Sequence, residues 1–282
     1  MKAEITTITP EHAAKLLRGN TNNRKMRRSL VERYARDMGE GRWIPNGEAV
    51  VVNGRTLIDG QHRLQACIES GAPFQTVFVS GVSLDAVSTI DTGAGRTFSD
   101  VLKMHGVADH NSIAGIVRFG WGWDQGNLYR TLNPSTLELS EWLDMNPEVH
   151  EALAIVGPAR NNPLRAKASS LACVVLKSIQ NGHREDAVAF IDQMISGANL
   201  SEYDAVFHLR NLFINQATSH KKLSRVDIHA RIIKAWNYYI LGEECGKLIW
   251  KNRGARKYRE AFPAMVDGNG AAISHIFSDD RD

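Results

Sequence analysis

The residues best suited to chemistry form one short string, Asp59-Gly60-Gln61-His62-Arg63, where a predicted strand gives way to a predicted helix. Glycine lets the backbone turn sharply and approach a ligand closely. A helix start directs unpaired backbone N–H groups and a partial positive charge at one point. That combination suits an anion, above all a phosphate. The string therefore predicts a phosphate site.

Three side chains of this string have candidate roles. The planar fork of Arg63 suits two-point recognition of a phosphate. His62 could donate to a phosphate oxygen, act as an acid or base near neutral pH, or be structural. Asp59 has three open roles: it could orient Arg63, hold a metal-bound water or cap the helix.

The elements that must position these residues are a hairpin and a helix. Strands over Ala49–Val52 and Thr56–Ile58 flank Asn53-Gly54, which is typical of a type I′ turn. The helix that follows Gly60 places Leu64, Cys67 and Ile68 on its apolar side, and Gly71 is its predicted stop.

The rest of the first third alternates between strand and helix patterns. The predicted elements are a strand over Ile5–Ile8, helices over Pro10–Leu17 and Ser29–Met38, a strand over Phe74–Val79, a helix from Ser83 to Ile90, and a helix to His105 opened by a capping box at Thr97-Phe98-Ser99-Asp100.

Beyond about residue 106 the strand patterns nearly vanish. Asn133-Pro134 and Asn146-Pro147 are typical of helix starts, and helical periodicity covers Pro163–Gln180, Arg184–Ile195, Tyr203–Gln216 and Ser224–Leu241. The predicted fold class is therefore α+β, with a mixed domain at residues 1–105 and an all-α domain of six or more helices at 106–282. We expect the tail from Met265 to Asp282 to be frayed.

Composition excludes several classes of protein. The 282 residues are 43% hydrophobic and 23% charged, a globular mixture without a long apolar run or a signal-peptide core, so we expect a soluble, cytoplasmic protein with no membrane partner. The three cysteines, Cys67, Cys173 and Cys245, are too widely spaced for a metal knuckle or a disulfide framework. We expect each to be a small buried hydrophobe, and we predict no metal-ligating residues.

Basic residues gather in two stretches, although the net charge is only +3. Between Lys15 and Arg36 the single acid is Glu32, and a second stretch runs from Lys247 to Arg259 with Trp250 and Tyr258. Such clusters neutralise nucleic-acid phosphates, or they are solvated helix faces.

The string Asp-Gly-Gln-His-Arg-Leu-x-Ala at 59–66 resembles the signature helix start of the ParB/sulfiredoxin superfamily. It is closest to phage and prophage ParB-like proteins and to the DGQHR proteins of DNA phosphorothioation systems. Asn23-Arg24 upstream and Ile90-Asp91-Thr92-Gly93 with Arg96 downstream fit the same pattern, so that the resemblance covers roughly residues 4–105.

The resemblance implies a ParB/sulfiredoxin-like fold for the first domain and a nucleotide phosphate bound at Gly60–Arg63. It also implies that Asn23 and Arg24 open the ligand cleft, and that Glu48 coordinates Mg²⁺ or activates a hydroxyl. Asp91, Thr92 and Arg96 would complete the pocket or merely turn the chain. Gln61 replaces the reactive cysteine of sulfiredoxin, which implies that this reductase activity is absent.

The leading functional hypothesis is a ParB-like phage or prophage protein that binds a nucleotide or a nucleic-acid phosphate and acts in DNA metabolism. The chemistry would be nucleotide hydrolysis or phosphoryl transfer, with Mg²⁺ and a nucleoside triphosphate as cofactors and Glu48, His62 and Arg63 as the catalytic residues. The alternatives are a ParB-like nuclease, which needs more carboxylates, and a non-enzymatic DNA-binding regulator with a helix-turn-helix within residues 163–216. The sequence predicts no oligomeric state.

Overall fold

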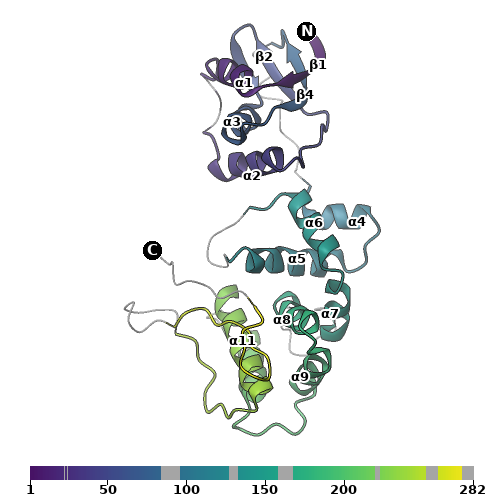
Figure 1. Ribbon diagram of the computed structural model, residues 1–282, viewed down its shortest axis with the longest axis vertical. Coiled ribbons are helices and arrows are strands. Elements are labelled where there is room, and N and C mark those ends of the chain that lie inside the picture. The colour runs from purple at the N-terminus through teal and green to yellow at the C-terminus, as the bar shows by residue number, and fades with distance from the viewer. Residues whose placement is uncertain are drawn as a thin grey trace. The chain divides into compact units, whose positions relative to one another are not determined.

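The computed structural model describes residues 1–21, 23, 25–83, 96–126, 133–157, 168–219, 223–251 and 260–274. These residues form an α+β protein with one four-stranded mixed sheet and a largely helical second half (Figure 1). The chain divides into two compact units: unit 1 comprises Met1–Arg96 with Leu132–Ser140, and unit 2 comprises Thr97–Thr131 with Glu141–Asp282.

The sheet of unit 1 has the order β1-β4-β2-β3, formed by β1 (Lys2–Ile8), β4 (Phe74–Ser80), β2 (Ala49–Asn53) and β3 (Thr56–Asp59). Strand β4 is antiparallel to β1 and parallel to β2, whereas β2 and β3 form an antiparallel hairpin. From β3 the chain crosses through a helix to reach β4 on the other side of β2. The string at 59–63 lies where that crossover begins.

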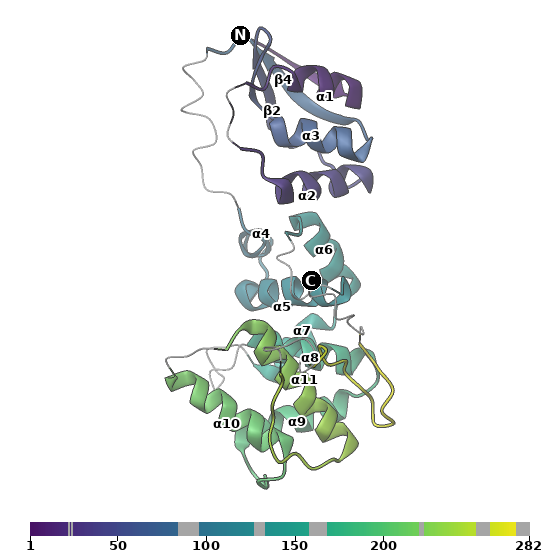
Figure 2. The same cartoon turned by 90° about the vertical axis from the view of Figure 1, so that its left-hand side faces the viewer.

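Unit 1 also contains α1 (Pro10–Leu17), α2 (Arg28–Gly39) and α3 (Gln61–Ser70), and Figures 1 and 2 show α3 between the sheet and α2. Helices α1 and α2 both pack on α3. Their apolar faces join strand residues such as Ile8, Val50 and Phe74 in one core. The predicted bounds of α1 are confirmed, and Gly71 ends α3 in the left-handed conformation.

The hairpin turn differs from the prediction. Asn53 pairs with Thr56, so the two turn residues are Gly54 and Arg55. Gly54 has a φ of 57°, and Asn53 is not among the residues with positive φ. The predicted type I′ turn at Asn53-Gly54 is therefore wrong, because Asn53 remains in the strand and glycine takes the first turn position.

Unit 2 begins earlier than the boundary predicted after residue 105. The predicted capping box forms between Thr97 and Asp100 and opens α4 (Phe98–Met104), which packs on α5 (His110–Asp124). The helix predicted from Ser83 falls on residues 84–90, which lie outside the described residues.

Helix α8 (Ala168–Gln180) is the centre of unit 2 and packs against α5, α7 (Val149–Val156), α9 (Arg184–Ser196) and α11 (Arg225–Leu241). Helix α10 (Ala205–Thr218) packs on α9 and α11 (Figure 2). The helical character predicted for these segments is confirmed, except at residues 163–167, which lie outside the described residues. In the described part of the chain, no helix is long and apolar enough to cross a membrane.

The prediction for the cysteines is confirmed, whereas the prediction of a frayed tail is wrong for part of that segment. All three cysteines are free and buried, as predicted. The tail prediction is wrong for 265–274, because Met265 is fully buried, Val266 forms a bridge with Ala272, and the Val266 carbonyl accepts from the Trp236 indole at 3.0 Å. Long-range contacts with α11 hold a segment whose own composition favours disorder. Residues 275–282 lie outside the described residues.

A buried ion network attaches residues 133–140 to α2. The Glu138 carboxylate accepts from Arg36 Nε at 2.8 Å and from the Ser135 amide at 2.6 Å, and Ser135 Oγ donates to Asp37 at 2.8 Å. Ser135 and Glu138 form the capping box of α6 (Thr136–Met145). The helix start predicted at Asn133-Pro134 is therefore wrong, because Ser135 and not Asn133 caps the helix.

This network has consequences for charge. Burial raises the pKa of Glu138, but the hydrogen bonds from Arg36 and Ser135 outweigh it and leave the pKa below its ordinary value. Burial also raises the pKa of Asp37. Arg36 forms an ion pair with Glu138, and Arg28 forms ion pairs with Glu32 and Glu69. The two arginines are therefore not among the basic residues available to phosphates.

We expect Glu138→Gln to lower the free energy of unfolding by about 2 kcal/mol at neutral pH, because it leaves the partly buried Arg36 guanidinium without its carboxylate. The folded state holds the Glu138 pKa below the ordinary 4.5, so this stabilisation is lost as the pH falls through the folded value. The difference between variant and wild type should therefore shrink in acid, as measured by urea unfolding.

Glu32→Gln is the matched control, because Glu32 pairs with Arg28 at an exposed position of α2, the helix that carries Arg36. Its expected cost is below about 1 kcal/mol at any pH. Equal costs for the two variants would show that the Glu138 network does not stabilise unit 1.

Candidate functional site

The start of α3 is shaped by Gly60. This residue caps the helix with a φ of 103°, a conformation that side chains disfavour. A Cβ atom there would lie 3.0 Å from Val50 Cγ2. Glycine is thus required both for the turn and for the close approach of β3 to β2.

Arg63 lies buried in the first turn of α3. Its Nη2 donates to the Ala49 carbonyl at 2.7 Å and to Asp59 Oδ2 at 3.3 Å. Of the three roles predicted for Asp59, the orienting one is therefore present. Because Nη2 is held by these acceptors, Arg63 does not present a free two-point fork as the sequence suggested.

The second terminal nitrogen of Arg63 is in a different position. Nη1 is buried and has no hydrogen-bond partner among the residues described. It lies 3.7 Å from Glu48 Oε2, beyond hydrogen-bond distance, and the Glu48 side chain is 62% exposed. Arg63 therefore combines one fixed nitrogen with one donor that faces an exposed carboxylate.

Gln61 and His62 are buried and hold the preceding loop. His62 Nε2 accepts from the Arg27 backbone N–H at 3.0 Å, and Gln61 Oε1 accepts from Asn20 Nδ2 at 3.0 Å. A histidine nitrogen that accepts is unprotonated, so in this arrangement the neutral ring carries its proton on Nδ1. The observed contact makes His62 a positioning residue, and its acid–base role stays a prediction.

The loop at 19–27, described except for residues 22 and 24, lies along β3. The Gly19 carbonyl accepts from the Leu57 N–H at 2.9 Å, and Asn23 Nδ2 donates to the Leu57 carbonyl at 2.9 Å and to Asn20 Oδ1 at 2.7 Å. A Cβ atom on Gly19 would lie 1.8 Å from the Arg55 carbonyl oxygen. The loop and the hairpin are thus in backbone contact.

The structure brings together most of the residues predicted for the site. Six of them gather at the start of α3: Glu48, Asp59, Gly60, Gln61, His62 and Arg63. Asn23 lies in the adjoining loop, with its amide nitrogen bonded to protein. Arg96 is exposed, and no hydrogen bond or ion pair of the described residues joins it to α3. Arg24, Asp91 and Thr92 lie outside the described residues.

Sequence reasoning missed Asn20, the Ala49 carbonyl and the Arg27 backbone N–H. Gly19-Asn20 is a recognisable turn dipeptide. Nothing local, however, indicates that Asn20 bonds Gln61 far along the chain.

The described residues contain no group of three or more His, Cys, Asp or Glu side chains placed to hold a metal ion. Glu48 and Asp59 are the carboxylates that contact Arg63. Comparison of the chain with protein-family models, curated proteins and solved structures gave no match.

We expect Gly19→Ala to lower the free energy of unfolding by about 3 kcal/mol, because the new methyl group meets a backbone carbonyl that no rotamer change can move. Gly39→Ala is the matched control in the same unit, since its Cβ would meet only Ser70 Cβ at an ordinary 3.8 Å. The control should be neutral or slightly stabilising. Equal denaturant midpoints for the two variants would contradict the close approach of loop and hairpin.

Proposed function

We propose that this chain is a ParB-like protein that binds a phosphate-bearing ligand, a nucleotide or a nucleic-acid phosphate, at the start of α3 and acts in DNA metabolism. The observation that carries the proposal is the buried Nη1 of Arg63, which lacks a hydrogen-bond partner among the described residues and lies beside the glycine-led helix start.

A buried guanidinium nitrogen without an acceptor is costly, so its environment favours binding of an anionic oxygen. Glu48 Oε2 lies 3.7 Å from Arg63 Nη1, so the two charges attract one another without forming a hydrogen bond. Because its side chain is 62% exposed, it can move aside at little cost. A phosphate oxygen in its place would gain a charge-assisted hydrogen bond from Arg63 and the favourable field of the helix start.

Exposed basic residues nearby favour a nucleic acid or a polyphosphate as the ligand. Lys15 and Arg18 precede the loop at 19–27, Lys25 and Arg27 lie within it, and in the described part of the chain none of the four forms an ion pair. Their charges would attract phosphates to the start of α3 in a salt-dependent way.

The proposed chemistry is positioning and electrostatic stabilisation of a phosphoryl group. Arg63 would supply the donor, Asp59 would orient it, and Gly60 would let the backbone approach. Mg²⁺ would arrive with a nucleoside triphosphate and take most of its ligands from the phosphates, with Glu48 as the exposed protein carboxylate.

The test is a thermal-shift and calorimetric screen of nucleoside triphosphates, orthophosphate and a DNA oligonucleotide, each with and without Mg²⁺. We expect a ligand-dependent rise in Tm that falls in Arg63→Lys, because lysine cannot keep both the Ala49 bond and the free donor. In the absence of Mg²⁺, Glu48→Gln should bind about threefold more tightly, since it removes a competing carboxylate from an exposed position.

Glu4→Gln is the control for Glu48→Gln, because it makes the same charge change on exposed strand β1 of the same sheet. Absence of binding by all these ligands, or equal affinities for the two glutamine variants, would overturn the proposal. If the affinity for DNA falls steeply with salt concentration and is unchanged by nucleotides, the result would instead favour the non-enzymatic regulator.

A further inference from the structure

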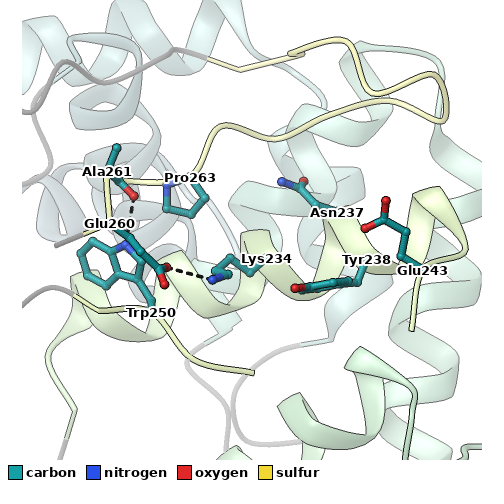
Figure 3. Close-up of a pocket in the computed structure, with 8 residues that line it drawn as sticks. All are labelled: Lys234, Asn237, Tyr238, Glu243, Trp250, Glu260, Ala261 and Pro263. Atoms are coloured by element: carbon teal, nitrogen blue, oxygen red, sulfur yellow. Dashed lines mark hydrogen bonds and ion pairs between the residues drawn. The ribbon is translucent and has the colours of Figure 1, made fainter. Parts of the chain in front are cut away.

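Unit 2 contains a cavity of about 300 Å³ on one face of helix α11. Figure 3 shows Tyr238 and Glu243 at one end of the cavity, Trp250 and Glu260 at the other, and Lys234 between them. This volume is at the small end of ligand pockets and suits one extended side chain or a small molecule.

Most polar groups of the cavity already hold the protein together. Lys234 Nζ donates to the Ile249 carbonyl at 2.7 Å and to Glu260 Oε2 at 2.9 Å. The Trp250 indole donates to the Ala261 carbonyl at 3.0 Å. These bonds fix the segments before and after residues 252–259 against α11, so the described walls are preformed.

Asn237 is committed in the same way. Its Nδ2 donates to the Ala264 carbonyl at 2.8 Å, and its Oδ1 accepts from the Val266 amide at 3.1 Å. Each end of this amide therefore already bonds the segment at 264–266. Among the described residues that line the cavity, two polar groups remain without a side-chain bond, and both lie at one end.

Those groups are Glu243 and Tyr238. Across the residues that the structure describes, neither the Glu243 carboxylate nor the Tyr238 hydroxyl has a side-chain hydrogen bond or ion pair. Glu260 neutralises Lys234 at the other end, which leaves Glu243 as the uncompensated charge of the lining. A carboxylate beside an aromatic ring attracts cations and repels phosphates.

We infer that this cavity binds a cationic organic group, a guanidinium or ammonium on an aliphatic stem. The stem would pack on Pro263 and Trp250, and the cation would lie between the Tyr238 ring and the Glu243 carboxylate. The group is either a small free amine or a basic side chain of a peptide. This inference does not depend on the phosphate site proposed in unit 1.

Calorimetry of the full chain tests it with agmatine as the free cation and an acetylated, amidated Gly-Arg-Gly peptide as the side-chain source. We expect binding of at least one ligand and about tenfold weaker binding in Glu243→Gln, which removes the charged acceptor. Tighter binding of the peptide assigns the site to a partner's side chain, and tighter binding of agmatine assigns it to a small cation.

Glu244→Gln is the matched control, because it makes the same change at the next residue, which is exposed and does not line the cavity. The neutral ligand control is the same peptide with citrulline in place of arginine. Equal affinities for the arginine and citrulline peptides, equal effects of the two variants, or no binding of either cation at millimolar concentration would overturn the inference.

Discussion

The burial of three polar side chains at the start of α3 constrains most of unit 1. Gln61, His62 and Arg63 are nearly inaccessible, and buried polar groups must find partners because their loss of water is otherwise uncompensated. Their partners lie on three separate segments: the loop at 19–27, the residue that begins β2 and the end of β3. The side chains that suggest chemistry are therefore also the ones that fix the loop and hairpin in place.

Local sequence patterns predicted the helix ends well where a single residue type determines where a helix begins or stops. Pro10 starts α1, Gly71 ends α3, and Thr97 with Asp100 caps α4, because each acts on backbone groups within a few residues. The same logic failed at Asn53, whose strand pairing outweighed its turn preference.

Partners distant in the sequence could not be predicted in this way. Arg36 belongs to a basic run, yet its carboxylate comes from Glu138, and the composition of 265–274 gives no sign that α11 holds it. At the candidate site, the residue types and their place at a helix start were predictable. The commitment of Arg63 Nη2 to Ala49 and Asp59 was not, because it depends on how β2 packs beside the crossover.

The close approach of Gly19 to the Arg55 carbonyl also limits how this protein can change in length. The loop passes the hairpin at a point with no room for a side chain, and the turn there is only two residues long. An insertion in the turn would push its carbonyl into the loop, and an insertion in the loop would shift Asn20 and Asn23 away from their acceptors. Loop and turn can therefore lengthen only through compensating changes, whereas most surface connections tolerate extra residues independently.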